Sequence, residues 1–383
     1  MRERIMIYTS AITLAFLLAL VLFTKRNRTK ADGILAIWLV MMGLHLVLYY
    51  SSTKVDPYYY PYLLISFPFP LLHGPMLYLY TASLTAQHTY LKKHARWHFV
   101  LPLFFFLTLV PFYLLPHADR LEVFANQGKG YEWLLVSHKV IVMLSGVVYV
   151  VISSVLLQRH KKSLRHRFSD VEKINLVWLQ YLIYSVGLVW LAVIYGNDVI
   201  IFSLVALFVL FLGYFGIKQV GIFTQPLQPE TNEITPNPED VKSEAPSPEP
   251  PKSKYLKSTL TVEAQVDIHQ KLQKVMDEGK VFLNPELTLS DLADQLAVHP
   301  NHLSQVINSM ESKTFYDYVN GRRIEEFKKI VALPANQKYT LLGLAFECGF
   351  NSKTAFYRNF KNVTGLSPTL YLKQKHIQIQ ADE

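Results

Sequence analysis

The sequence predicts an all-α chain in three parts. These are an N-terminal bundle of seven transmembrane helices, a disordered linker rich in proline and glutamate, and a C-terminal all-α domain with two pairs of short helices. Of the 383 residues, 51% are hydrophobic and only 17% are charged, below the quarter that is usual in soluble domains. Long apolar runs are confined to the first 217 residues, whereas helical periodicity with few strand-like alternations follows residue 254. We therefore predict domains at 1–217, 218–253 and 254–383.

The excess of positive charge lies in the apolar part of the chain. Residues 1–217 contain 19 basic and 9 acidic side chains, whereas residues 254–383 contain 16 and 14. A soluble nucleic-acid binder would not need cations between apolar runs, but a membrane protein does. The single cysteine, Cys348, excludes an internal disulfide and any multi-cysteine metal site. We expect it to be a small buried residue, and we expect neither a metal nor a cofactor.

Seven apolar runs approach the roughly 20 helical residues that cross a hydrocarbon core of about 30 Å. They are approximately Ile5–Phe23, Ile34–Tyr50, Leu63–Leu84, Phe99–Leu115, Leu134–Leu157, Ile174–Tyr195 and Val199–Phe215. The first run starts with MRER, lacks a small-residue cleavage site and is followed at once by KRNRTK. This pattern favours a retained anchor over a cleaved signal peptide.

The loops between these runs predict the orientation of the bundle. Thirteen basic residues lie in the loops after the first, third and fifth runs, against five on the other side. Cytoplasmic loops of membrane proteins are enriched in Lys and Arg, so we expect the amino terminus outside and everything after Phe215 in the cytoplasm.

The third run, SFPFPLLHGPMLYLY, should be a kinked or broken helix. Pro68, Pro70 and Pro75 each remove a backbone donor, and Gly74 permits close approach of a neighbouring helix. Broken helices at membrane depth usually line a cavity.

Two histidines in the apolar runs are candidates for ligand sensing. His73 lies at the expected break and His45 lies within the second run. Ionisable groups inside a membrane are functional candidates by default. The alternative is a structural one, in which both are neutral and hydrogen-bonded to neighbouring helices or backbone.

Residues 225–253, QPLQPETNEITPNPEDVKSEAPSPEPPKS, should form a disordered tether. They contain eight prolines and six acidic residues but almost no large apolar side chain. Such a segment cannot bury enough surface to offset the entropy of ordering. Because a flexible tether transmits orientation poorly, we favour dimerisation in the membrane and raised local concentration over a rigid lever.

The first pair of short helices is expected at about 288–310, in TLSDLADQLAVHPNHLSQVINSM. Ser290 can cap the first helix, and a turn at 299–301 leads to the second helix. The outward face of the second helix is polar and uncharged, and comprises Asn301, His302, Ser304, Gln305 and Asn308. Asn and Gln address adenine in the major groove, whereas a solvated helix face would more often mix Glu and Lys. The pattern favours DNA reading.

A linker helix at 314–333 and a second helix pair at about 340–366 follow. The second helix of this pair has outward groups suited to phosphates or guanine: Ser352, Lys353, Thr354, Tyr357, Arg358 and Lys361. Residues 300–375 contain 11 basic and 5 acidic residues, so positive charge is concentrated here. About 20 helical residues span roughly 30 Å, close to the roughly 34–36 Å between successive major-groove faces of B-DNA. One chain could therefore place two reading helices in adjacent groove turns.

These residues resemble a known family. LTLSDLADQLAVHPNHLSQVIN, FYDYVNGRRIEEFKKI and LAFECGFNSKTAFYRNFKNVTGLSPTLYL are similar to the paired helix-turn-helix domain of AraC/XylS-type transcription regulators, over about 100 residues. The resemblance implies that the second helix of each pair enters the major groove, and that Arg323 is structural or phosphate-facing. Gln305 stands where many relatives carry Arg or Lys. The apolar half resembles a membrane-anchored subgroup of this family with a seven-span N-terminal domain.

We therefore expect a membrane-anchored, sequence-specific DNA-binding transcription regulator of the bacterial inner membrane, which couples a signal at the bundle to promoter binding. Expected partners are double-stranded promoter DNA, the lipid bilayer, a second copy of the chain, and a small-molecule or protein signal. The alternative is a membrane receptor or transporter whose cytoplasmic helical domain binds a protein. An enzyme is not expected, because the sequence has no glycine-rich phosphate loop, no H-E-x-x-H and no G-x-S-x-G.

Overall fold

The structure is a computed structural model, and its described part is helical. It describes residues 2–52, 57–59, 64–85, 94–172, 174, 176–195, 198–218 and 260–380. Within these residues there is no β-strand, only two isolated bridges, which confirms the all-α class. The expected tether, 225–253, lies outside the described residues. By its contacts the chain divides into two units, Met1–His160 with Leu176–Gln225 and Lys161–Asn175 with Pro226–Glu383. In this division Lys161–Asn175 groups with the C-terminal part, and the expected domain bounds stay a prediction.

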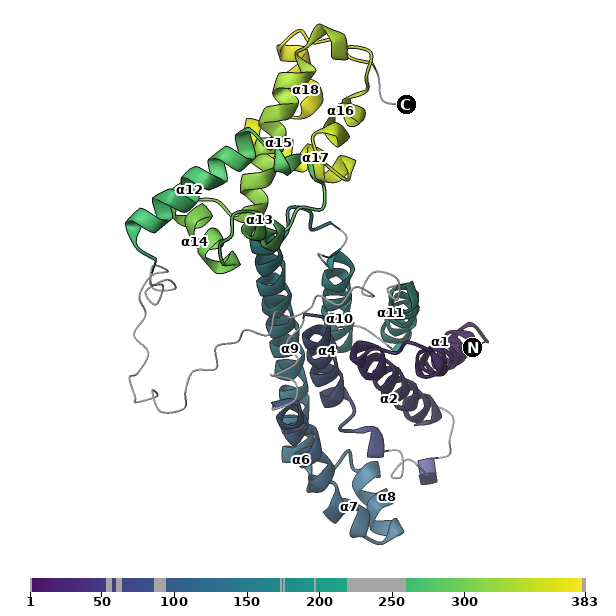
Figure 1. Cartoon of the computed structure of the whole chain (residues 1–383). Helices are drawn as coiled ribbons and strands as arrows, with labels where there is room; N and C mark the ends of the chain where they lie inside the picture. The colour runs from purple at the N-terminus through teal and green to yellow at the C-terminus, as the bar shows by residue number, and fades with distance from the viewer. Residues whose placement is uncertain are drawn as a thin grey trace. The chain divides into compact units, whose positions relative to one another are not determined.

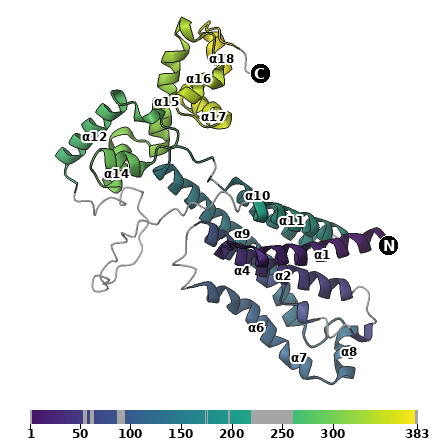
Figure 2. The same ribbon diagram turned by 45° about the vertical axis from the view of Figure 1, so that its right-hand side comes forward.

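The first unit is a bundle of apolar helices (Figures 1 and 2). Its helices are α1 (Arg2–Thr24), α2 (Lys30–Ser52), α4 (Pro70–Leu84), α6 (Val100–Thr108), α7 (Val110–Leu114), α8 (His117–Ala125), α9 (Glu132–Arg167) up to His160, α10 (Val177–Tyr195) and α11 (Asp198–Lys218). Helix α1 packs against α2 and α11, α10 packs against α11, and α2 packs against α4. At the α1–α2 turn, the Asp32 carboxylate accepts bonds from Lys25 Nζ and Thr29 N, both at 2.7 Å.

Four helical segments of the described part are long and apolar enough to cross a membrane. They are Met6–Thr24, Lys30–Ser51, Ala95–Leu114 and Glu132–Arg167, and the shorter apolar helices are Val177–Val193 and Ile200–Phe215. These four long segments and two shorter helices coincide with six of the seven expected apolar runs, all except the third. The third run contains α4, which has 15 residues. The count of seven spans stays a prediction.

The break expected in the third run lies before α4, and His73, which was expected at the break, lies within the helix. A turn at 67–69 precedes the helix, Pro70 occupies its first position, and Pro75 lies inside the helix. A Cβ added at Gly74 would lie 2.5 Å from Tyr149 Cδ2 on α9, so the close approach expected at this glycine is present.

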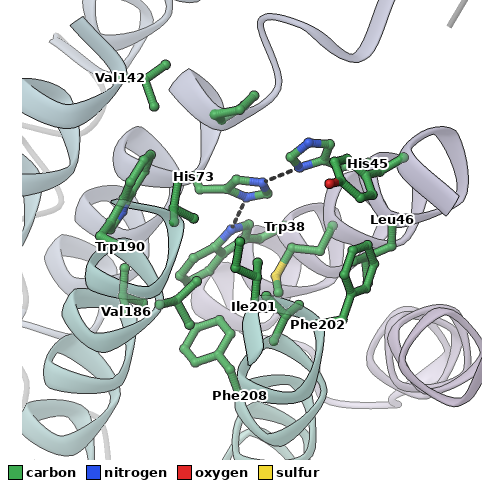
Figure 3. Close-up of a pocket in the computed structure, with 16 residues that line it drawn as sticks. Trp38, His45, Leu46, His73, Val142, Val186, Trp190, Ile201, Phe202 and Phe208 are labelled. Carbon is green, nitrogen blue, oxygen red and sulfur yellow. Dashed lines mark hydrogen bonds between the residues drawn. The ribbon is translucent and has the colours of Figure 1, made fainter. Parts of the chain in front are cut away.

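The two histidines are joined by a chain of hydrogen bonds (Figure 3). The Trp38 indole Nε1 donates to His73 Nδ1 at 3.2 Å, and His73 Nε2 lies 3.0 Å from His45 Nδ1. Since an indole N–H can only donate, His73 Nδ1 must accept. The proton of the neutral His73 ring therefore resides on its Nε2. That proton is then donated to His45 Nδ1, which leaves the proton of His45 on Nε2. The two imidazoles are thus hydrogen-bonded to neighbouring helices; their role in sensing stays a prediction.

The second unit is built around α15 (Figures 1 and 2). Its helices are α12 (Val262–Asp277), α13 (Leu289–Gln295), α14 (Pro300–Glu311), α15 (Phe315–Val331), α16 (Leu341–Glu347), α17 (Lys353–Thr364) and α18 (Pro368–Gln374). The first half of α15 contributes Phe315, Tyr318 and Val319 to a core shared with α12, α13 and α14. Its second half contributes Ile324 and Phe327 to a core shared with α16, α17 and α18. One helix therefore joins the two helix pairs.

Short polar side chains set where these helices begin. Thr314, Thr340 and Ser352 each accept a bond from a backbone N–H in the first turn of the helix that follows. The expectation that Ser290 caps α13 is wrong. Thr288 is the cap, because its hydroxyl accepts from Asp291 N while the Asp291 carboxylate accepts from Thr288 N.

The turn between α16 and α17 contains the only cysteine and an obligatory glycine. Cys348 is fully buried, and burial raises the pKa of its thiol to about 12, so it is the small buried residue that was expected. Gly349 has φ +89°, and a Cβ there would lie 2.7 Å from Leu283 O and 2.8 Å from Phe282 O. Both facts require glycine at this turn.

Candidate nucleic-acid interface

Helix α14, the expected first reading helix, is held by an apolar inner face. Leu303, Val306 and Ile307 have no exposed surface. At its start, His299 Nδ1 accepts from Asn301 N at 3.2 Å. Of the expected reading residues, Asn301 is exposed, and His302, Ser304, Gln305 and Asn308 are partly exposed. The Asn308 side-chain amide donates to Ser304 O at 2.7 Å, so one donor on this face is already engaged within the helix.

Helix α17, the expected second reading helix, is anchored by Phe356 and Phe360, which have no exposed surface. Ser352 caps it by accepting from Ala355 N at 3.1 Å, as the sequence predicts. Thr354 and two lysines are exposed, and Tyr357 is partly exposed. The lysines, Lys353 and Lys361, form no ion pair with a described residue. Free cations are therefore available on this helix.

The cations of the linker helix are arranged differently. Arg322 pairs with Asp277 at 2.7 Å, and Lys328 pairs with Glu325 at 2.9 Å. Glu326 on the same helix pairs with Lys280 at 2.6 Å. Because carboxylates already neutralise these charges, α17 contributes more of the positive field that DNA would meet than α15 does.

Arg323 is a structural residue of α15. It is 1% exposed, and its guanidinium donates to Phe282 O and Asn284 O, both at 2.7 Å, and to Asn320 Oδ1 at 3.1 Å. Burial lowers the pKa of this guanidinium to about 10, so it stays charged at neutral pH. Of the two roles that the family resemblance implies for Arg323, burial excludes contact with phosphate.

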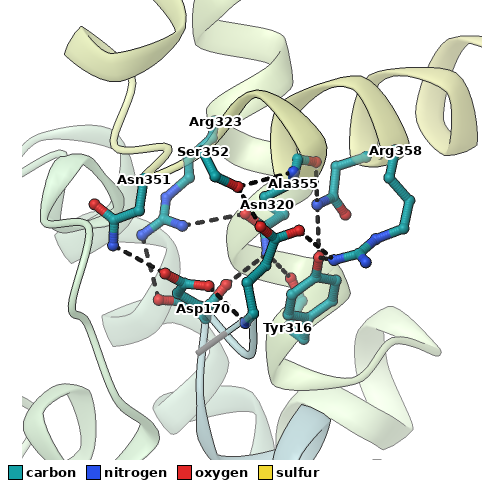
Figure 4. A network of polar contacts seen from close by, with 11 residues as sticks. Asp170, Tyr316, Asn320, Arg323, Asn351, Ser352, Ala355 and Arg358 are labelled. Carbon is teal, nitrogen blue, oxygen red and sulfur yellow. Dashed lines mark hydrogen bonds and ion pairs between the residues drawn. The ribbon is translucent and has the colours of Figure 1, made fainter. Parts of the chain in front are cut away.

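A segment far away in the sequence is docked on this unit (Figure 4). We call residues 168–172, which follow the end of α9, the docked loop. Ser169 Oγ donates to Leu287 O at 2.6 Å, and Asn320 Nδ2 donates to Ser169 O at 2.8 Å. Arg323 Nη2 donates to Ser169 Oγ at 3.2 Å. The buried Arg323 network is therefore completed by a residue that lies 154 positions earlier in the chain.

Apolar contacts hold the same loop in place. Val171 of the docked loop and Leu164 of α9 are buried together with Tyr316 of α15. Phe168 of the docked loop packs against them. The docked loop thus combines buried apolar side chains with buried hydrogen bonds, the usual composition of a folded contact.

Two acidic residues of the docked loop engage the second reading helix. The Glu172 carboxylate accepts from the Ser352 hydroxyl and lies 3.6 Å from Arg358 Nη2. Asp170 Oδ2 accepts from Asn351 Nδ2 at 3.0 Å. A carboxylate beside a helix N-terminus and an arginine occupies the kind of position in which a DNA phosphate binds. Two of the expected DNA-binding residues are therefore already engaged by protein groups.

Arg358 is also held from its other side. Its Nη2 donates to the Tyr316 hydroxyl at 2.8 Å, and the same hydroxyl accepts from Asn359 Nδ2 at 2.7 Å. Sequence reasoning missed the docked loop because the segment after the fifth run was considered only for its positive charge. The available signal was the pair of acids, Asp170 and Glu172, within a loop that carries six basic residues.

A helix-turn-helix domain family matches residues 292–374. The match begins within α13 and covers the rest of the first helix pair, the linker helix α15 and the second helix pair. Residues 292–374 form an AraC-type helix-turn-helix domain. Over 121 residues the chain is 25% identical to the melibiose operon regulatory protein of Escherichia coli (strain K12), which covers 32% of this chain and 38% of that protein. Over 117 residues it is 28% identical to an uncharacterized HTH-type transcriptional regulator of Staphylococcus aureus (strain COL), covering 30% of this chain and 15% of that protein.

The chain therefore spans less than two fifths of the length of these relatives. No solved structure matches it. The docked loop and helices α1 to α11 lie outside the residues that match the AraC-type domain. The contacts of Glu172 thus add a segment from elsewhere in the chain to this domain.

Proposed function

We propose that this protein is a membrane-anchored, sequence-specific transcription regulator whose AraC-type domain binds promoter DNA. The observation that carries this proposal is the pair of short capped helices, α14 and α17, packed on the two halves of α15 and each with a polar outer face. The name of one relative, the melibiose operon regulatory protein, points to the same class of function.

In this proposal the two helices have different tasks. Helix α14 reads base edges through uncharged groups, and α17 contributes cations and hydroxyls to phosphates and bases. The proposed DNA-binding residues are Asn301, His302, Ser304, Gln305, Asn308, Ser352, Lys353, Thr354, Tyr357, Arg358 and Lys361. Long apolar helices support an anchor in the bacterial inner membrane, and the loop charges favour an external amino terminus with the AraC-type domain in the cytoplasm. No catalytic role is proposed.

The salt dependence of binding tests the phosphate contacts of α17. Using DNA selected from a random library, we expect Lys353→Ala to weaken binding about equally on all sequences and to reduce the slope of log affinity against log salt by about 1. Fluorescence anisotropy at several salt concentrations measures both quantities. The control is Lys271→Ala on α12, which removes a lysine paired with Asp267 at 2.7 Å. Equal slopes for the wild type and Lys353→Ala would contradict a phosphate contact at Lys353.

We also propose that the docked loop couples the membrane domain to DNA binding. Helix α9 is continuous from Glu132 to Arg167, and its last seven residues belong to the unit that contains the AraC-type domain. In the docked state, Glu172 competes with DNA phosphate for Ser352 and Arg358. This route is more direct than the tether and membrane dimerisation that the sequence alone suggested.

Removing the negative charge of Glu172 in the docked loop should therefore strengthen DNA binding. In the full-length protein, we expect Glu172→Gln to raise operator affinity about three- to tenfold, because a partly exposed ion pair contributes on the order of 1 kcal/mol. A fragment of residues 254–383, which lacks the docked loop, should bind as tightly as this variant.

The matched control is Glu278→Gln, which removes the same charge from an exposed position of the second unit. Anisotropy titrations of the four proteins measure the effect. Unchanged or weaker binding by Glu172→Gln, while Glu278→Gln behaves as wild type, would exclude competition by the docked loop but leave the DNA-binding proposal intact.

A further inference from the structure

A cavity of about 450 Å³ lies in the first unit between α2, α4, α10 and α11 (Figure 3). This volume is within the range of roughly 300–1,000 Å³ that is typical of small-molecule sites. The residues around it are mostly apolar and include Trp38, Val186, Phe202 and Phe208, and none of the described lining residues is Asp, Glu, Lys or Arg. A cavity without a charged partner selects against charged ligands, because an unpaired charge there would be costly.

The polar end of the cavity is formed by the two histidines. The direction of the hydrogen bonds from Trp38 through His73 to His45 fixes both tautomers, and the proton of His45 is left on Nε2. His45 lines the cavity, and its Nε2 has no hydrogen-bond partner in the described part of the chain. An N–H group in apolar surroundings is stabilised when it finds an acceptor. Among the described residues the cavity therefore presents a donor without the acceptor that would complete the hydrogen bond.

We propose that this cavity binds an uncharged, mainly apolar small molecule that carries a hydrogen-bond acceptor such as a carbonyl oxygen. His45 Nε2–H donates to that oxygen, and the apolar body of the ligand fills the space between α10 and α11. Trp38 and His73 are positioning residues, since they hold the proton of His45 on Nε2, the nitrogen for which the described residues provide no acceptor. Binding at this site does not require the DNA-binding proposal, and it can be measured without DNA.

Photoaffinity labelling of the full-length protein in phospholipid nanodiscs tests the site. The probe is a medium-chain alkyl ketone with a diazirine at the end of its chain, and labelled residues are mapped by mass spectrometry. We expect labels on cavity-lining residues of α2, α10 or α11. Because 2-decanone carries the acceptor and decane does not, 2-decanone should compete about tenfold better, the effect of one hydrogen bond in apolar surroundings.

Three variants isolate the role of His45. His45→Phe keeps an aromatic ring but removes the donor, so the preference for ketone over decane should be lost. His45→Gln retains an N–H donor and should keep much of that preference. The control is His98→Phe, which removes a histidine whose Nδ1 lies 3.0 Å from the Tyr149 hydroxyl, outside the cavity lining.

Three results would overturn the proposal. The first is equal competition by 2-decanone and decane on the wild type, which would mean an apolar void without acceptor recognition. The second is labelling of lipid-facing residues alone, or no competition by either compound, as expected if membrane acyl chains fill the space. The third is an unchanged ketone preference in His45→Phe.

Discussion

Replacement of Arg323 by alanine should destabilise the AraC-type domain by about 3–5 kcal/mol. The substitution leaves the buried carbonyl of Phe282 and the part-buried carbonyl of Asn284 without their donor, and it opens a cavity beside the middle of α15. Domains of this size have unfolding free energies of roughly 5–15 kcal/mol, so much of the stability would be lost. Urea denaturation of a fragment of residues 254–383, followed by far-UV circular dichroism, measures the change.

The neighbouring arginine provides the control for this experiment. Arg322→Ala removes the same side chain one position earlier, where its partner Asp277 is 62% exposed. Solvent screens such a pair, and we expect a loss of at most about 1 kcal/mol. If the two variants were equally stable, the buried network would not support the domain in the way that its geometry indicates.

Changing the spacing between the two DNA half-sites should reduce affinity about 100-fold or more. Helix α15 has 17 residues, about 25 Å of helix, and both of its halves are buried in the cores that carry α14 and α17. One molecule therefore holds its two reading helices at a fixed separation. An insertion of half a helical turn, about 5 base pairs, turns the second half-site to the opposite face of the duplex, so one reading helix loses its contacts.

An insertion of a full turn, about 10 base pairs, distinguishes one chain from two. This insertion returns the second half-site to the original face of the duplex but leaves it farther from the first half-site. A single domain with a rigid α15 should therefore still bind weakly. Two chains joined by flexible segments would regain affinity on this DNA. The control keeps the original spacing and replaces only the bases between the half-sites, which should change affinity by no more than about threefold. Anisotropy titrations with the fragment of residues 254–383 provide the comparison.

Much of the second unit could be predicted because its signals are local. A cap such as Thr314 or Ser352, followed by apolar positions at helical spacing, marks a helix from its own residues. The error at α13 was of the same local kind. Thr288 and Ser290 are both competent caps, and only the reciprocal bond with Asp291 selects Thr288.

The docked loop could not be predicted in this way. Its contacts join residues more than 100 positions apart, such as Ser169 and Arg323, and a segment of five residues has no periodicity that names its partner. The histidine pair is similar. Sequence analysis identified His45 and His73 separately as candidates, but only the packing of α2 against α4 brings them within a hydrogen bond of each other. Both the docked loop and the His45–His73 pair therefore depend on contacts between segments that are distant in the sequence.

The burial of Cys348 has a practical consequence for work on this chain. Thiolates, and not thiols, react with maleimides, and this thiol is both shielded from solvent and shifted toward its protonated form. Toward such reagents the folded protein therefore behaves as though it contained no cysteine. A cysteine introduced at an exposed position, such as Gln127 between α8 and α9, becomes a single addressable handle for fluorophores, spin labels or membrane-impermeant probes.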